Sequence, residues 1–154
     1  MRITRISLVL AGAAFLFSSG ASRAQMTVTN TATLDFGTLA PSAVAGTVVI
    51  SPAGGRTTTG GVKGVSGTFG PGAFKVAITS GSSNFFFFLP GNATLSSGGN
   101  TMTVNAFTSN PTSPGTVPGP PGSIVVYVGA TLNVGANQAA GTYTGTYSIF
   151  FLHL

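Results

Sequence analysis

The sequence predicts an all-β domain, built as an antiparallel sandwich or barrel. Short runs of β-branched and aromatic residues recur along the chain and are separated by clusters of Gly, Pro, Asn and Ser. Strong helix formers are scarce after the first 24 residues, whereas Gly and Thr are abundant. Of the two architectures we favour an immunoglobulin-like sandwich of Greek-key type, because short strands with frequent turns are typical of it.

The first 24 residues have the order of a secretory signal peptide. A basic start at residues 1–5 precedes an uncharged apolar run at 6–17, and small residues follow. Ser22 and Ala24 suit the positions before a cleavage site, which predicts a cut between Ala24 and Gln25. A membrane anchor is the alternative, but the apolar run spans only about 18 Å as a helix, against a hydrocarbon core of roughly 30 Å. We therefore expect export to the periplasm, cell surface or medium.

The mature chain, residues 25–154, is predicted to be one nearly uncharged domain with no transmembrane segment. Charged residues make up 5% of the sequence, against roughly 25% in soluble domains. Loss of the leader would leave Arg56, Lys63 and Lys75 with Asp35, a net charge of +2. These cations are not clustered, which argues against nucleic-acid binding. With no Cys, the domain must depend on burial and hydrogen bonds.

The scarcity of titratable groups also predicts that the protein is not an enzyme and binds no cofactor or metal. Asp35 and His153 are the only Asp and His, and Glu is absent. A Ser-His-Asp triad would need both of them, and metal sites usually need more ligands. Asp35 lies in a Leu-Asp-Phe-Gly segment, where a carboxylate commonly accepts backbone N–H groups. His153 is the penultimate residue, in an expected mobile tail.

Alternation and turn residues define the expected strands to within two or three residues. In the run FKVAIT, Phe74, Val76 and Ile78 share one face. In the run 102–107, Met102, Val104 and Ala106 are expected to share one face and Phe107 to lie on the other. The predicted strands are 27–36, 47–51, 64–69, 74–79, 85–89, 93–96, 102–107, 123–128, 130–134 and 142–152.

Gly and Pro mark the predicted connections. Gly60-Gly61 and Gly98-Gly99-Asn100 are expected turns, because Gly accepts a positive φ without strain. Residues 108–122 hold five of the nine prolines and are predicted to form a Pro/Gly-rich surface loop, since Pro cannot donate to a strand ladder. An extended partner-binding segment is the alternative for this stretch.

Two strands carry apolar residues on both faces. In FFFFL at 85–89, Phe86 and Phe88 alternate with Phe85 and Phe87. Near the C-terminus, Phe150 and Leu152 stand on the side that Thr144 and Thr146 would make polar. Either another part of the chain covers Phe86, Phe88, Phe150 and Leu152, or these residues contact a partner.

The three tyrosines allow a second function. Tyr127, Tyr143 and Tyr147 could stack on sugars if they lined one concave face. Tyr143 and Tyr147 share a strand face that is also the expected core face.

Several segments resemble the exported bacterial family called domain of unknown function 4402. They are LDFGTLAP at 34–41, GTVVI at 46–50, RTTTGGV at 56–62, LP at 89–90, MTV at 102–104, VGATLNV at 128–134 and AGTYTGTY at 140–147. The resemblance implies an exported all-β domain and supplies no catalytic residues. The closing AGTYTGTY also resembles, more weakly, the last strand of spore-coat-U-like and chaperone–usher pilus subunits.

From these observations we expect a non-enzymatic structural or assembly protein, such as a pilin-like or surface-layer subunit. It would associate with itself or with other surface subunits by β-strand pairing. The terminal strands 27–36 and 142–152 are the expected pairing edges. The alternative is a carbohydrate- or matrix-binding module.

Overall fold

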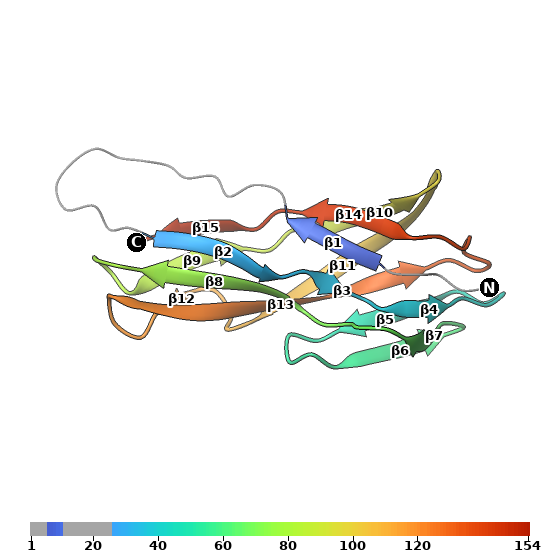
Figure 1. Cartoon of the computed structure of the whole chain (residues 1–154), viewed down its shortest axis with the longest axis horizontal. Helices are drawn as coiled ribbons and strands as arrows, with labels where there is room; N and C mark the ends of the chain where they lie inside the picture. Colours follow the sequence, from blue (N-terminus) through green and yellow to red (C-terminus); the bar gives the residue numbers. More distant parts are fainter. Residues whose placement is uncertain (1–5, 11–25) are drawn as a thin grey trace.

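The computed structural model describes residues 6–10 and 26–154, and every regular element among them is a β-strand (Figure 1). The strands are β1 (Ile6–Leu10), β2 (Met26–Ala32), β3 (Leu34–Asp35), β4 (Thr38–Ala40), β5 (Gly46–Ile50), β6 (Arg56–Gly60), β7 (Lys63–Ser66), β8 (Gly72–Ile78), β9 (Asn84–Phe88), β10 (Asn92–Ser97), β11 (Asn100–Asn110), β12 (Gly115–Thr116), β13 (Gly122–Val134), β14 (Tyr143–Tyr147) and β15 (Phe150–His153). Pairing is antiparallel throughout the described chain, except between β1 and β14.

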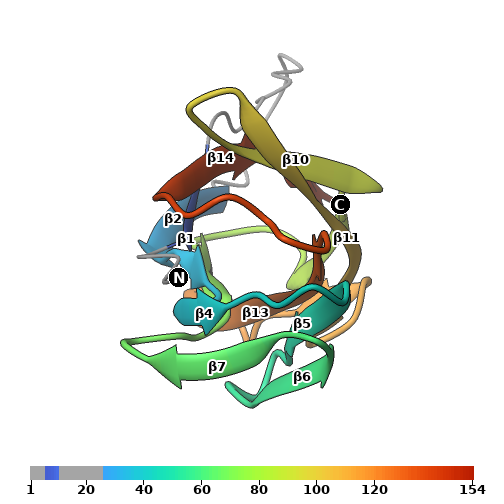
Figure 2. The ribbon, with the colours of Figure 1, turned by 90° about the vertical axis from the view of Figure 1, so that its right-hand side faces the viewer.

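The strands form a sandwich-like arrangement. The largest sheet runs β2-β8-β13-β11-β10-β14-β1-β3, and β5 and β6 continue from β13. In the end-on view β10 and β14 lie on one side of the core and β13, β5 and β6 on the other (Figure 2). A three-stranded sheet, β12-β9-β15, and a two-stranded sheet, β4-β7, complete the described fold. The predicted all-β, antiparallel fold class is confirmed.

The thirteen-residue strand β13 organises the sheet, where the sequence predicted two shorter strands. Along one edge β13 pairs first with β8, from Gly122 to Val128, and then with β5, from Ala130 to Val134. Gly129 lies between the two partners, and a side chain there would overlap the carbonyl oxygen of Ile50. Glycine thus lets one strand exchange partners without a break, because the backbone of β5 approaches where a Cβ would stand.

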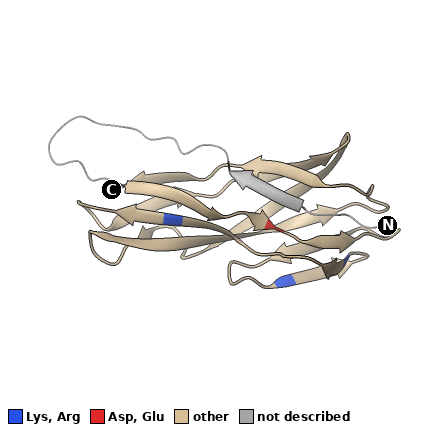
Figure 3. Ribbon diagram, in the orientation of Figure 1, with Lys and Arg blue, Asp and Glu red and all other residues tan. Residues whose placement is uncertain are grey.

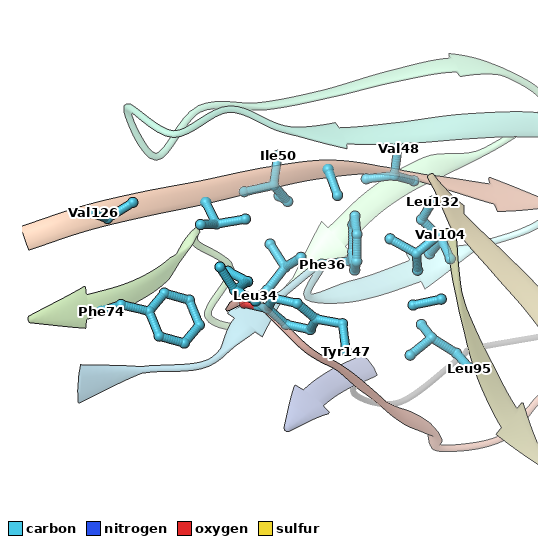
Figure 4. Close-up of a cluster of buried hydrophobic side chains, with 14 of the residues drawn as sticks. Leu34, Phe36, Val48, Ile50, Phe74, Leu95, Val104, Val126, Leu132 and Tyr147 are labelled. Carbon is cyan, nitrogen blue, oxygen red and sulfur yellow. The ribbon is translucent and has the colours of Figure 1, made fainter. Parts of the chain in front are cut away.

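The core lies between the layers and is almost entirely aliphatic and aromatic (Figure 4). The predicted alternation of β8 is confirmed: Phe74, Val76 and Ile78 are fully buried, and Lys75 is exposed. No charged or polar residue is buried in the described chain. Stability therefore rests on apolar burial and the backbone ladders.

A β-bulge in β11 overturns the facing predicted for residues 106 and 107. The pairing of β11 with β13 shifts register between Asn105 and Thr108, and Ala106 has a positive φ of 48°. The extra residue reverses the alternation, so Ala106 is exposed and Phe107 packs against the core. The prediction that Ala106 shares a face with Met102 and Val104, with Phe107 on the other face, was wrong, because strict alternation fails at a bulge.

The expected turns at 60–61 and 98–99 are present, but β1, β4, β6 and β12 lie outside every predicted strand. Gly98 and Gly99 both have positive φ and link β10 to β11 as a two-residue hairpin turn. Strand β6 has the sequence Arg-Thr-Thr-Thr-Gly, which has no apolar alternation. It pairs with β5 on one side and is largely exposed. Its backbone pairing therefore identifies it as a strand, whereas its side-chain pattern does not.

The Pro/Gly-rich stretch predicted as a loop is anchored to the domain. Strand β11 extends into it as far as Asn110, and β12 pairs with β9 within it. Val117 is fully buried, and the Ser113 Oγ accepts a 3.0 Å hydrogen bond from the Phe87 N–H. These contacts hold the segment against β9 instead of leaving it as a free surface loop.

Replacing Gly129 with Ala should lower the free energy of unfolding by about 2–3 kcal/mol, because β5 and β13 would have to separate. Chemical denaturation measures the change. Gly91→Ala is the matched control, since nothing lies within 4 Å of a side chain placed there. An equal effect of both substitutions would contradict the close approach at Gly129.

Candidate functional site

The most distinctive surface lies where β9 pairs with β15. Both strands are rich in Phe, and they pair with Phe150 opposite Phe88 and Leu152 opposite Phe86. The chain reaches β15 directly from β14, and Ser148 and Ile149 join the two strands. Since side chains alternate along each strand, the ladder has one aromatic face toward the core and one toward the surface.

The inner face of this ladder is a packed aromatic cluster. The Phe87 and Phe151 rings are 5.6 Å apart and stacked, and Phe85 lies 6.0 Å from Phe87 and 6.3 Å from Phe151. Phe74 of β8 joins at 6.1 Å from Phe151. These centroid distances fall in the range in which aromatic pairs attract, so the cluster fixes the ladder on the body of the domain.

The outer face brings together all four predicted contact residues, Phe86, Phe88, Phe150 and Leu152, which we name the outer patch. Phe88 is 61% exposed, Phe150 58% and Leu152 48%, and Phe86 is half-buried. Leu154 adds a further exposed side chain at 53%. Within the described chain, β15 is the last strand of its sheet, with β9 as its one partner. The patch therefore adjoins a free strand edge.

The C-terminal tail is ordered, contrary to the mobile tail that we expected. His153 belongs to β15, and its Nε2 lies 2.7 Å from the carbonyl oxygen of Ser82. The Leu154 N–H donates to the carbonyl of Asn84 at 3.4 Å. Backbone pairing of β15 with β9 thus holds the tail in place despite its terminal position.

Asp35 has the predicted role in a turn. Its Oδ1 accepts a 2.8 Å hydrogen bond from the Gly37 N–H, and its backbone exchanges two 2.9 Å hydrogen bonds with Gly70. Asp35 and His153 therefore make hydrogen bonds with different parts of the backbone, Asp35 with Gly37 and Gly70 and His153 with Ser82. Among the described residues, no group of three or more His, Cys, Asp or Glu side chains could hold a metal ion.

The charged residues are sparse in the described part of the chain (Figure 3). Arg56 is the most engaged of them. Its guanidinium carbon lies 4.2 Å from the centroid of the Phe69 ring, and its Nη1 donates to the carbonyl of Phe36 at 3.2 Å. This side chain therefore holds the neighbouring segments at Phe36 and Phe69 in place.

The tyrosines do not share one face. Tyr143 and Tyr147 are buried in the core, while Tyr127 is 42% exposed. Tyr127 lies in a shallow hollow of about 670 Å³ beside β2 and β3, which Phe69, Asn30 and Asp35 also line. This hollow could not be predicted from the sequence, since its walls come from segments that are distant along the chain.

The two buried tyrosines differ in their hydroxyl groups. The Tyr143 hydroxyl donates to the carbonyl of Ala139 at 2.8 Å and accepts from the Gln138 side chain at 2.9 Å. The Tyr147 hydroxyl has no hydrogen-bond partner in the described structure, and it occupies the space that a side chain at Gly72 would need. Burial raises the pKa of Tyr147 well above its ordinary value.

A comparison with family models matches residues 26–151 to the domain of unknown function DUF4402. The chain belongs to this family. The match spans nearly all of the described DUF4402 domain, from β2 into β15, and agrees with the predicted resemblance. No curated protein and no solved structure matches the chain. The similarity to spore-coat-U-like and pilus subunits stays a prediction.

Two further predictions concern the leader and the membrane. The expected cleavage site at Ala24 and Gln25 lies outside the described residues. In the part of the DUF4402 chain that the structure describes, no helix is long and apolar enough to cross a membrane.

Tyr147→Phe should raise the free energy of unfolding by about 1 kcal/mol, because a buried hydroxyl without a partner is removed. Tyr143→Phe, the matched change on the same strand, should lower it by about 1–2 kcal/mol, because two hydrogen bonds are lost. Chemical denaturation at neutral pH measures both.

Alkaline pH provides a second comparison. Because the pKa of Tyr147 is raised in the folded state, ionisation above about pH 10 favours unfolding, so stability should fall as pH increases there. Tyr147→Phe should reduce that fall. If the parent protein and the Tyr147→Phe variant lose stability equally above that pH, the hydroxyl is not buried as described.

Proposed function

We propose that this DUF4402 protein is an exported, non-enzymatic structural or assembly subunit, pilin-like or belonging to a surface layer. It associates with copies of itself or with other surface subunits through an edge strand. The observation that carries the proposal is the outer patch beside the free edge of β15, where three side chains are about half exposed or more.

Burial of the outer patch would supply the free energy of association. Covering one large apolar side chain is worth about 1.5–3 kcal/mol. Phe88 and Phe150 stand directly opposite each other, so one contact could cover both rings. The free backbone groups of β15 would add hydrogen bonds to a partner strand, as in β-augmentation.

The charge distribution favours the same role. Neither β9 nor β15 contains Lys, Arg, Asp or Glu. Charged side chains on edge strands commonly prevent strand-to-strand association, and this edge has none of them. With few charges in the whole domain, repulsion between copies is weak.

Export is supported by the leader sequence at 1–24 and places this association in the periplasm, at the cell surface or outside the cell. The single carboxylate and the separate partners of Asp35 and His153 support a role without catalysis.

The double variant Phe88→Ser/Phe150→Ser should reduce self-association of the protein, because it removes the facing pair of exposed rings. Sedimentation velocity across a range of concentrations measures the sedimentation coefficient of both proteins. Val44→Ser is the matched control, since Val44 is 62% exposed outside the ladder. A parent protein that stays monomeric at every concentration, or a double variant that associates like the parent, would refute assembly through the patch.

A second candidate is a carbohydrate- or matrix-binding module, and the hollow at Tyr127 and Phe69 supports it. Both rings are about two-fifths exposed, at 42% and 41%, and could stack on a sugar. The polar groups beside them are partly engaged, since the Asn30 side-chain amide donates to the carbonyls of Ala32 and Ala73.

Affinity electrophoresis in gels containing soluble polysaccharides tests this candidate. Retardation of the parent protein that Tyr127→Ala abolishes, and that Phe150→Ser leaves unchanged, is the expected result for sugar binding at the hollow. Equal mobility of all three proteins in every gel would reject it.

A further inference from the structure

The sheet of the full chain contains one strand from the predicted leader. Strand β1 lies between β14 and β3: it pairs in parallel with β14, from Ile6 opposite Tyr143 to Leu10 opposite Tyr147, and antiparallel with β3 at Ser7 and Leu8. Without β1, the neighbouring edges of β14 and β3 would lose their partner. We call the space between these two strands the slot.

The slot has the width of one strand. Adjacent strands lie about 4.8 Å apart, so two strands that share a partner are about 10 Å apart. The residues that flank the slot are apolar and buried: Leu34 of β3 and Tyr143 are fully buried, and Tyr147 is 4% exposed. Without β1, the walls would therefore combine an unpaired backbone edge on β14 with apolar side chains from both strands.

Both walls are held by contacts that do not involve β1. On its other edge β14 pairs with β10, at Ser96 and Thr144, and Gly145 lets the backbones approach closely, because a side chain there would overlap the carbonyl oxygen of Thr94. Strand β3 is fixed by the two 2.9 Å hydrogen bonds between Asp35 and Gly70, and β2, which precedes it, pairs with β8. The slot should thus persist after the leader is removed.

We propose that the slot is a strand-accepting site, filled by the leader segment Ile6–Leu10 before cleavage and afterwards by an uncharged, apolar strand of a separate exported polypeptide. The ligand chemistry follows from the present occupant, whose sequence Ile-Ser-Leu-Val-Leu has no charge. The occupant runs parallel to β14, unlike every other strand pair described, and such a strand need not be connected closely to its neighbours. The inference rests on the proposed export, because cleavage must separate β1 from β2.

The open slot would attract such a strand for two physical reasons. The edge of β14 would pair with a new strand along five residues, and Leu34 of β3 would add a shorter contact on the other side of that strand. Apolar side chains on that strand would also lie beside Leu34, Tyr143 and Tyr147. A charged strand would have to bury its charge beside these residues at high cost.

The test uses the full chain, synthesised cell-free with its leader retained and with a specific protease site placed between Leu10 and Met26. After folding, the protease cuts between β1 and β2, and a fluorescent peptide with the sequence of residues 3–12 is added. The anisotropy of this peptide should rise as it replaces the cut segment. Hydrogen exchange at the β14 amides should be slow when either peptide is bound and faster when the slot is empty.

The control is the same peptide with Leu8→Pro, in which residue 8 has no backbone N–H to donate to a neighbouring strand. It should bind about tenfold more weakly or worse, because proline cannot donate within a central strand. Equal binding of both peptides, or β14 amides that exchange at one rate with and without the segment, would overturn the proposal. In the Phe88→Ser/Phe150→Ser variant, which lacks the exposed pair of rings, dimerisation of the cut chain that blocks peptide binding would show a second copy's strand in the slot and would also overturn the proposal.

The Phe88→Ser/Phe150→Ser variant separates this inference from the proposed function. It should bind the peptide as the parent protein does, because both substitutions lie on β15 and β9, outside the slot. Failure of peptide binding with intact self-association would reject the slot alone. The reverse result would reject assembly through the outer patch alone.

Discussion

The fold depends on the continuous backbone ladder of β13. This one strand pairs with β8, β5 and β11, and so joins the layers of a domain that has no disulfide and almost no charge. The ladder stays unbroken only because Gly129 allows β5 to approach at the exchange of partners. On the opposite edge the β11 bulge falls beside the same glycine, since Thr108 pairs with Gly129. The exchange of partners and the bulge therefore lie at the same level of the sheet.

The sequence predicted the elements in which burial alternates regularly. Strand β8 was predicted with its faces correct because Phe74, Val76 and Ile78 are buried at a period of two. The outer patch was predicted for a related reason: four consecutive Phe must place two of them on the far face, whatever the register. The pairing of Phe88 with Phe150 could not be predicted, because it depends on how two segments 62 positions apart in the chain meet.

The failures have local physical causes. Strand β6 has only polar and small side chains beyond Arg56, so nothing in its pattern distinguishes a paired strand from a loop. At Ala106 a single residue of positive φ reverses the alternation, and alanine carries no signal for that conformation. The segment that forms β1 belongs to an apolar run of the sequence, but nothing in that run predicted its pairing with β14. A leader and a central strand are both uncharged and apolar, so composition alone does not separate them.

The outer patch and the slot lie on consecutive strands of one short segment. Strand β14 forms a wall of the slot, and β15 carries half of the patch, with Ser148 and Ile149 between them. Ile149 is buried, which anchors the connection between the two strands in the core. A strand that fills the slot would pair with the edge of β14 and, through this connection, act on β15 and its exposed rings. Removal of β1 would leave that edge of β14 unpaired, so association at the patch would become sensitive to the state of the slot. Two surfaces on one segment would thus let cleavage of the leader and capture of a partner strand control when the subunit assembles.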